Sequence, residues 1–214
     1  MAFPTTLNGW IAYVRNWIGA DEYSDAQIGN FLDLAQVRMN TDLMSFYMEK
    51  LFSYTVLAAG LNQPINLVTV LPDFGKIRLV SVQGVGPLDV AALNEYVAKA
   101  QNPNNTYYVP RIYSIDANKL YIWPWPAEGD IVDIHYYEKV PLLSATINSN
   151  TFTLKHPDLL LYASSLEAAP YMVEDERIPV WESKYMTGVL IANAASNKIK
   201  LGSTPLLRRV EGLS

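Results

Sequence analysis

Histidine and acidic side chains are the residues of this sequence best suited to acid–base chemistry or metal binding, and their spacing favours neither. His135 and His156 lie far apart in the sequence, so no pair one helical turn apart is present to hold a metal ion. The run Glu174-Asp175-Glu176 could bind a hard cation, but adjacent like charges at a helix end are usually solvated. We therefore expect neither a metal site nor a cofactor.

The usual nucleophile motifs are also missing from the sequence. It contains no cysteine, which removes disulfides, thiolate ligands and thiol nucleophiles together. No Gly-x-Ser-x-Gly or Ser-x-x-Lys pattern occurs, and the segment 84–87, Gly-Val-Gly-Pro, lacks the third glycine of a dinucleotide-binding loop. We expect a protein that is not an enzyme, with an unrecognised hydrolase that uses scattered carboxylates as the least favoured alternative.

Aromatic side chains are concentrated in the middle of the sequence and suggest a competing function. Rings on a β-sheet can stack on sugars or bases, which would make the protein a carbohydrate-binding or single-strand-binding module. The ordinary alternative is a hydrophobic core together with a protein interface. We favour the second, because the nearby polar residues have the spacing of turns. The candidates for a tail or subunit interface are Tyr107, Tyr108, Trp123 and Trp125.

The composition predicts a folded protein with an extensive interface. Half of the 214 residues are apolar and 17% are charged, below the roughly 25% of an average soluble protein. Aromatic residues are too frequent for disorder, and no apolar run is long enough for a membrane span. The first ten residues lack the features of a signal peptide, so we expect a cytosolic protein. An obligate subunit interface would cover the surplus apolar surface.

Charge divides the sequence into an acidic body and a basic C-terminal segment. Residues 1–197 carry 12 basic and 20 acidic residues, whereas residues 198–214 carry four basic residues and one acidic residue. The net charge of −5 argues against general nucleic-acid binding. Gly202 and Pro205 separate the segment from the preceding helical pattern. We predict that residues 201–214 form an extended docking arm whose binding residues are Leu206, Leu207, Arg208, Arg209 and Val210.

Hydrophobic periodicity predicts helices at both ends of the chain. Helical patterns cover residues 6–18, a helix capped by Ser24 with Gln27, a helix starting at Pro157, and residues 179–199. We expect the third of these helices to bend or end at Pro170. In the last, small residues including Gly188 permit close packing, and the buried stripe should contain Trp181, Tyr185, Gly188, Val189, Ala192, Ala195 and Ile199.

The middle of the sequence has a strand-like pattern. We predict strands at residues 52–57, 65–70 and 77–82, a short helix capped by Asp89, and a hairpin of residues 107–115 with 119–123. The strand 130–138 should pair next to this hairpin. Together these patterns predict an α+β fold. A helical domain of residues 1–48 and 153–200 contains an inserted β-rich, sandwich- or barrel-like domain of residues 49–152, and the arm follows.

The order of these elements resembles that of the adaptor proteins of short-tailed bacteriophages, the tail tubular protein A-like or head–tail connector family. The resemblance covers nearly the whole chain. The segments that carry it are Pro110-Arg111-Ile112-Tyr113, Leu120 to Pro126 (Leu-Tyr-Ile-Trp-Pro-Trp-Pro), Tyr136-Tyr137-Glu138, and His156 to Tyr162 (His-Pro-Asp-Leu-Leu-Leu-Tyr) followed by Trp181 and Tyr185. Each segment is a packing pattern, and their order and spacing carry the specificity.

This resemblance implies a structural virion protein at the head–tail junction, assembled in the host cytoplasm. Its partners would be further copies of itself in a ring of twelve subunits, the portal protein and the tail nozzle protein. Genomic DNA would pass through the ring without sequence-specific binding, and no membrane would be involved.

Overall fold

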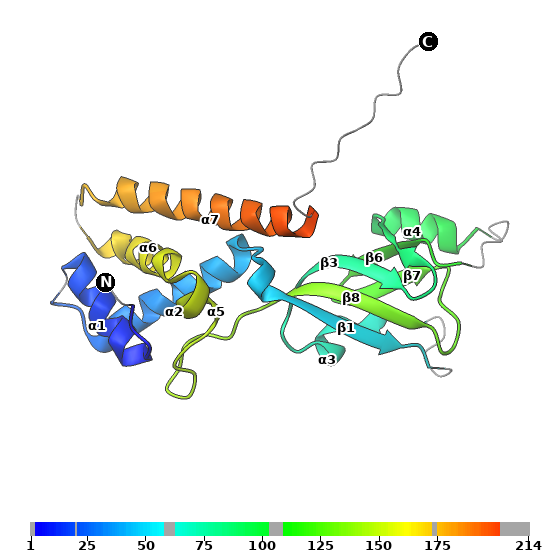
Figure 1. The fold of residues 1–214 in the computed structure, drawn as a ribbon, viewed down its shortest axis with the longest axis horizontal. Helices are drawn as coiled ribbons and strands as arrows, with labels where there is room; N and C mark the ends of the chain where they lie inside the picture. Colours follow the sequence, from blue (N-terminus) through cyan, green and yellow to red (C-terminus); the bar gives the residue numbers. More distant parts are fainter. Residues whose placement is uncertain (1–2, 20, 58–62, 103–108, 173–174, 202–214) are drawn as a thin grey trace, which may run out of the picture. The chain divides into compact units, whose positions relative to one another are not determined.

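The structure is a computed structural model that describes residues 3–19, 21–57, 63–102, 109–172 and 175–201. The chain forms two compact units, one of Met1–Tyr47 with Leu142–Ser214 and one of Met48–Pro141. The first is helical and the second is β-rich, so the α+β class is confirmed. The colours of Figure 1 show that both ends of the chain contribute to the helical unit.

Local capping explains where the first two helices begin. Helix α1 (Leu7–Ile18) starts after Thr6, whose hydroxyl accepts a hydrogen bond from the backbone N–H of Gly9, and it ends at Gly19 in the left-handed conformation. Helix α2 (Asp25–Asp42) starts with the predicted capping box. The Gln27 N–H donates to the Ser24 hydroxyl over 3.3 Å, and the Ser24 N–H donates to the Gln27 amide oxygen over 2.9 Å.

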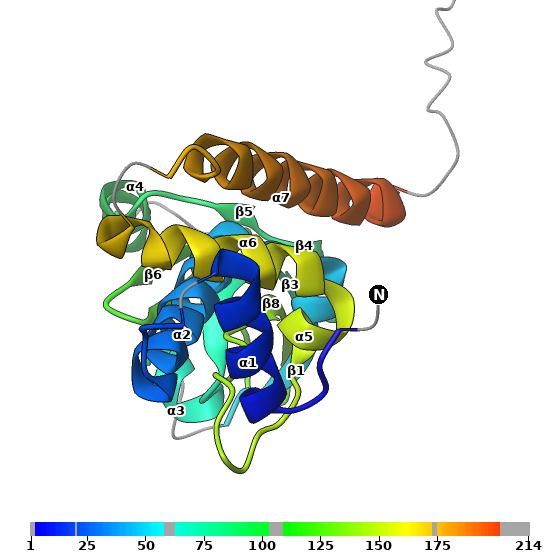
Figure 2. The ribbon, with the colours of Figure 1, turned by 90° about the vertical axis from the view of Figure 1, so that its left-hand side faces the viewer.

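Helix α6 (Pro157–Ala168) is the centre of the helical unit. It packs against α1, α2, α5 (Thr151–Lys155) and α7 (Ile178–Leu201), and Figure 2 shows these helices grouped around it. Pro157 occupies its first turn as predicted, and the helix gives way to a short 3-10 helix, η3 (Ala169–Tyr171), which contains Pro170. The sequence pattern places Leu159, Tyr162, Ala163, Leu166 and Ala169 on one face, but the buried positions of α6 spread over several faces: Leu159, Leu160, Leu161, Ala163, Ser164, Ser165 and Ala168.

The segment before α5 belongs to the helical unit, although we predicted it to be part of the β-rich domain. Its anchor is the fully buried side chain of Gln36 in α2. The Gln36 amide oxygen accepts hydrogen bonds from the backbone N–H of Leu143 at 2.9 Å and from Asn150 Nδ2 at 2.8 Å. Asn150 in turn caps α5. These hydrogen bonds join residues 142–150 to α2, and the sequence pattern does not reveal them.

Two four-stranded sheets form the β-rich unit. The first has the order β1 (Glu49–Thr55), β8 (Ile131–Glu138), β3 (Phe74–Val82), β4 (Gly86–Pro87). The second has the order β2 (Ile65–Asn66), β7 (Lys119–Trp123), β6 (Ile112–Asp116), β5 (Asp89–Val90). Residues of both sheets share one hydrophobic core, which makes the unit a sandwich: Val56, Ile65, Leu67, Leu71, Val80, Val82, Leu88, Tyr113, Leu120, Ile122, Val132, Ile134 and Tyr136.

The predicted hairpin is present, but our prediction that strand 130–138 pairs next to it is wrong. Strands β6 and β7 are joined through Ala117 and Asn118, which both have positive φ, as a tight two-residue turn requires. Strand β8 pairs with β1 and β3 in the other sheet. Gly129 and Asp130 form backbone hydrogen bonds with Val56 at the end of β1 and so direct the chain into that sheet.

Two further predictions in this unit are corrected. The predicted strand 65–70 is a two-residue strand followed by a helical turn, α3 (Leu67–Val70), because the Asn66 side chain accepts a hydrogen bond from the Thr69 N–H. Asp89 does not cap a helix. Its backbone N–H donates to the carbonyl of Arg111 in the parallel pairing of β5 with β6, and helix α4 (Leu93–Ala100) begins after Ala92.

Candidate functional site

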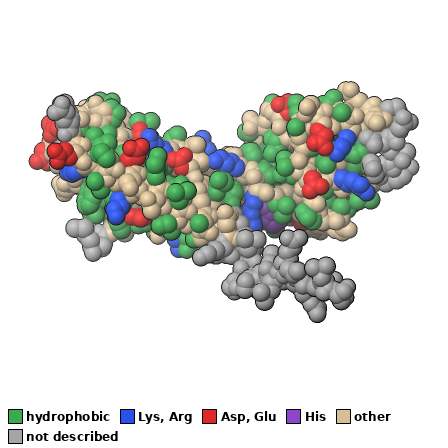
Figure 3. Space-filling model, turned by 90° about the horizontal axis from the view of Figure 1, so that it is seen from above, with side chains coloured by type: hydrophobic (Ala, Val, Ile, Leu, Met, Phe, Trp, Pro, Cys, Tyr) green, Lys and Arg blue, Asp and Glu red, His purple; other side chains and the backbone are tan. Residues whose placement is uncertain are grey.

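Helix α7 buries one narrow side and exposes apolar residues on another. Trp181 and Tyr185 are 3% and 5% exposed and face the helical unit. Met186 and Leu190 are 57% and 70% exposed, and Val180 and Ile191 are exposed as well. Figure 3 shows hydrophobic side chains interspersed with charged ones on this side of the helical unit. Such a face on a long helix is typical of a protein interface.

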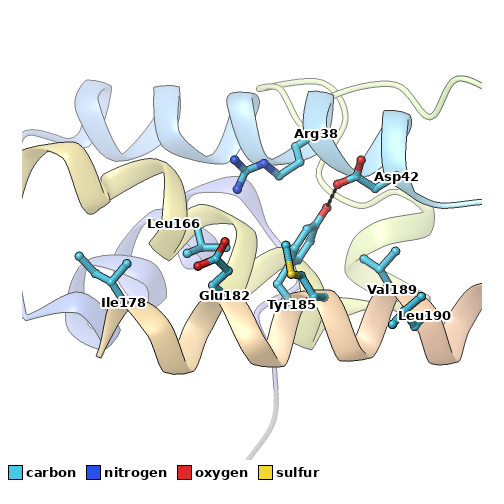
Figure 4. Close-up of a pocket in the computed structure, with 9 residues that line it drawn as sticks. Arg38, Asp42, Leu166, Ile178, Glu182, Tyr185, Val189 and Leu190 are labelled. Carbon is cyan, nitrogen blue, oxygen red and sulfur yellow. Dashed lines mark hydrogen bonds between the residues drawn. The ribbon is translucent and has the colours of Figure 1, made fainter. Parts of the chain in front are cut away.

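A groove with a volume of about 700 Å³ runs beside this exposed face. Figure 4 shows that its side chains come from three helices, α2, α6 and α7. The lining residues are Arg38, Asp42, Leu166, Ile178, Glu182, Tyr185, Met186, Val189 and Leu190. Most of the lining residues are apolar, and two of the three charged ones, Asp42 and Glu182, are acidic, so the groove suits an apolar segment that carries positive charge.

Polar contacts fix the α2 wall of the groove. The Tyr185 hydroxyl donates a 2.8 Å hydrogen bond to Asp42 Oδ2, drawn as a dashed line in Figure 4. Arg38 lies with its guanidinium carbon 5.9 Å from the centre of the Tyr185 ring and forms a 3.2 Å ion pair with Glu167. Burial and the hydrogen bond to Asp42 raise the pKa of Tyr185, so this hydroxyl stays protonated. These contacts make the α2 wall of the groove rigid. The Tyr185 hydroxyl in it is not poised for proton transfer at neutral pH.

Close packing and hydrogen bonds hold α7 on the rest of the helical unit. The α-carbon of Gly188 lies so close to Leu159 that an added β-carbon would collide with the leucine Cδ2, which confirms the predicted role of this small residue. Asn193 accepts a hydrogen bond from the Met44 N–H at 2.7 Å and donates one to the Asp42 carbonyl at 3.0 Å. Ser196 accepts one from the Phe46 N–H at 2.8 Å. The exposed face of α7 is therefore held in a fixed orientation.

The predicted site residues divide into two groups. The arm residues Leu206 to Val210, as well as Tyr107 and Tyr108, lie outside the described residues. Trp123 is half-buried at the end of β7, and Trp125 packs against the core of the β-rich unit. Their part in an interface stays a prediction.

The described aromatic residues of the β-rich unit lie mostly in its core. Tyr113, Tyr136 and Tyr137 are buried, and Tyr121 is half-buried beside Tyr96. Our interpretation of this aromatic group as core is therefore confirmed for the three buried tyrosines. Buried rings cannot stack on a sugar, so these residues do not form a carbohydrate platform.

Two acidic groups outside the groove are occupied by neighbouring cations. Lys50 contacts Asp73 and Glu138, each at 2.6 Å, and burial with a hydrogen bond to Asp73 raises the pKa of Tyr136 to about 12. Asp175, from the predicted acidic run, is ion-paired with Arg177, which also donates to the Ile18 carbonyl at the end of α1. No group of three potential metal ligands is found in the part of the chain that the structure describes.

The apolar face of α7 was not predicted from the sequence. Of our expected buried stripe, Trp181 and Tyr185 are buried and Val189 is half-buried, but Ala195 is exposed, and we did not consider the residues beside the stripe. Met186 and Leu190 follow Glu182 at helical spacing and form a second apolar line, and Ile191 lies about 100° further round the helix. A helix with two apolar stripes needs a partner on each. This signal was present in the sequence.

Comparison with known proteins assigns the chain to a family. No curated protein matches the sequence. None of the helices in the described part of the chain has the length and apolar character needed to cross a membrane. The family described as SU10 adaptor protein matches residues 5–206, nearly the whole length. The chain therefore belongs to the SU10 adaptor protein family and is a structural bacteriophage adaptor protein.

Proposed function

We propose that this protein is the adaptor subunit that joins the portal to the tail nozzle of a short-tailed phage. Twelve copies would form a ring at the head–tail junction of the virion, assembled in the host cytoplasm, and the ring would surround part of the DNA path. The observation that carries this proposal is the exposed apolar face of α7 in a member of a phage adaptor family.

The apolar face suits contact with a neighbouring subunit. A ring requires a heterologous contact, in which one surface of each subunit meets a different surface of the next. Leu190 and Met186 are too exposed to stabilise the isolated subunit much, whereas burial in an interface contributes about 25 cal/mol for each Å² of apolar area removed from water. This gain favours assembly over the free subunit.

The arm of residues 201–214 supplies the proposed contact with the portal. Leu206, Leu207 and Val210 would insert between apolar surfaces, and Arg208 and Arg209 would add charge-assisted hydrogen bonds. A segment that becomes ordered on binding can reach two adjacent portal subunits at an entropic cost. The aromatic residues 107, 108, 123 and 125 would serve the tail or subunit interface.

The decisive experiment measures the mass of the protein in solution with and without purified portal. We expect a ring of adaptor subunits that forms only when portal is present. Deletion of residues 203–214 should leave a folded protein by circular dichroism and abolish co-sedimentation with portal. A full-length protein that neither assembles nor co-sediments with portal would contradict the proposal.

The acidic body is suited to DNA passage without tight binding. Residues 1–197 have an excess of eight negative charges, which leaves few cations to replace the counterions of the phosphates. We expect no sub-micromolar affinity for duplex DNA at physiological salt, measured by fluorescence anisotropy. Tight binding by the free subunit would contradict the proposed passive conduit.

A further inference from the structure

The α7 groove combines an apolar floor with unbalanced negative charge. The lining contains one cationic side chain, Arg38, and two carboxylates, Asp42 and Glu182, and Glu167 beside the groove adds a third negative charge. Arg38 is paired with Glu167, and Asp42 accepts from the Tyr185 hydroxyl. Among the described residues none forms an ion pair or hydrogen bond with the Glu182 side chain. The groove therefore favours an occupant with apolar and basic side chains.

A segment with apolar and basic side chains begins a few residues after the end of α7. The segment Pro205-Leu206-Leu207-Arg208-Arg209-Val210 contains three large apolar residues and two arginines without an acidic residue. Arginine is well suited to a carboxylate, because its planar guanidinium forms paired hydrogen bonds with both oxygens. The charges and the apolar residues of the segment thus complement those of the groove.

The length of this segment matches the position of the groove. Leu201, the last residue of α7, is about 16 Å along the helix from Leu190 and about 28 Å from Glu182, at 1.5 Å per residue. A chain that turns back after Leu201 and is extended at about 3.3 Å per residue reaches about 20 Å at Leu207 and about 26 Å at Arg209. Gly202 is well placed for the reversal. Leu207 can therefore reach the apolar residues of the groove, and Arg209, with its long side chain, can reach Glu182.

We propose that in the free subunit residues 204–210 lie in the α7 groove of their own chain, with Leu206 and Leu207 on its apolar floor and Arg208 and Arg209 near Glu182 and Asp42. The segment covers the exposed apolar face of α7 before assembly. Its release leaves both the segment and the face available for other partners. The subunit thus limits self-association until a partner binds the arm. Binding in the groove does not itself depend on portal docking.

A disulfide test is direct, because the chain contains no cysteine. The full-length double variant Leu190→Cys, Leu207→Cys should form a disulfide under mild oxidation and migrate as a monomer of altered mobility in a non-reducing gel. The matched control is Leu154→Cys, Leu207→Cys, since Leu154 is 66% exposed on α5 and does not line the groove. We expect at least about tenfold slower cross-linking in the control, since a disulfide requires α-carbons within about 7 Å.

Two outcomes of this test overturn the proposal. Equal rates in the two double variants would show that residue 207 has no preference for the groove. Covalent dimers or larger species in place of the intramolecular product would place the segment on a neighbouring copy. Dilution distinguishes the cases further, because an intramolecular disulfide forms at a rate that does not depend on protein concentration.

A protease test needs no cysteine and compares the wild type with single-residue variants. Trypsin cleavage after Arg208 and Arg209 should be slow while the segment lies in the groove, since cleavage follows the population of the open form. We expect cleavage about tenfold faster in Leu190→Asp and in Glu182→Lys. The controls Leu154→Asp and Glu22→Lys alter exposed residues outside the groove and should cleave like the wild type. Equal rates in all five proteins would overturn the proposal.

Portal binding provides a separate measurement. If the segment leaves the groove to dock, Leu190→Asp should bind portal as well as or better than the wild type, while the 203–214 deletion fails to bind. A protein that passes the disulfide and protease tests but never binds portal would retain the groove interaction and refute only the portal role. The failures of the two proposals are thus distinguishable.

Discussion

Helices α6 and α7 have comparably apolar sequences and opposite surroundings. Helix α6 has neighbours on several faces, and even consecutive leucines, Leu159 to Leu161, are buried. Helix α7 buries a line through Trp181, Tyr185 and Ser196 and leaves Met186, Leu190 and Ile191 exposed. The apolar residues of α6 are explained by the fold of one subunit, whereas those of α7 call for a partner. The difference separates residues that stabilise the subunit from residues available for assembly.

The strongest test of this comparison removes a buried side chain from α6. Leu160 is 0% exposed, so Leu160→Ala should lower the free energy of unfolding by about 2–5 kcal/mol, because it removes apolar contacts and leaves a cavity. The measurement is urea denaturation followed by circular dichroism. Leu154→Ala, which alters an exposed side chain of α5, is the control and should change the free energy by less than about 0.5 kcal/mol. Equal effects would contradict the central position of α6.

A second test addresses the buried polar contact beside this core. Gln36→Leu removes the acceptor of the Leu143 N–H and one hydrogen-bond acceptor of the Asn150 side-chain amide. We expect a loss of about 1–3 kcal/mol in the free energy of unfolding, the usual cost of unsatisfied buried donors. Gln83→Leu is the control, because Gln83 is exposed and its amide contacts only the Asp133 side chain. A neutral Gln36→Leu would show that residues 142–150 do not depend on α2.

The contact between α6 and α7 can be tested with a pair of glycines. Gly188→Ala places a methyl group against Leu159, which is 2% exposed and has little room to move. We expect a net loss of about 1 kcal/mol, because the steric cost exceeds the usual gain of alanine over glycine in a helix. Gly29→Ala in α2 meets nothing within 4 Å and should stabilise the protein by about 0.5–1 kcal/mol. Thermal denaturation measures the stability of both variants. Stabilisation by Gly188→Ala would contradict close packing between α6 and α7 at this glycine.

The sequence was most informative where a signal was local. The Ser24–Gln27 capping box, Pro157 in a first helical turn, the end near Pro170 and the turn at residues 117–118 are each encoded within a few residues, and the structure contains all four. The α+β class followed from the change of period along the chain.

The errors concern contacts between distant residues or competition between local signals. The pairing of β8 with β1 and β3 depends on a change of sheet near Gly129, which no strand pattern encodes. The turn at Asn66 overrides a β-branched sequence that favours a strand. The α7 face was missed because the sequence does not say which of the apolar lines on a helix the subunit buries, and Met186 and Leu190 lie beside the line that contains the buried Trp181 and Tyr185. A groove made of three helices cannot be inferred from any one of them.

A smaller effect is expected from pH at the start of α6. Burial lowers the pKa of His156 below its ordinary value of 6.5, although Asp158 partly opposes this, and the ring lies 3.0 Å from the Ser45 hydroxyl. The unfolded chain therefore binds a proton more readily than the folded protein, so stability falls as the pH drops below about 6.5. His156→Gln should reduce this dependence between pH 7 and pH 5 in urea titrations. An unchanged slope would assign the effect to carboxylates.

The smallest effect on stability is expected on the exposed face of α7, and it completes the comparison with α6. Leu190 is 70% exposed, so Leu190→Ala removes little buried area and should change the free energy of unfolding by less than about 0.5 kcal/mol. The same variant should reduce ring formation in the presence of portal, because a neighbouring subunit would bury the methyl groups that it removes once the arm has left the groove. Urea denaturation and solution mass give the two values. If Leu190→Ala costs as much stability as Leu160→Ala, the face is already covered within the subunit and α7 is a core helix; if it leaves both stability and assembly unchanged, the face is not the subunit contact.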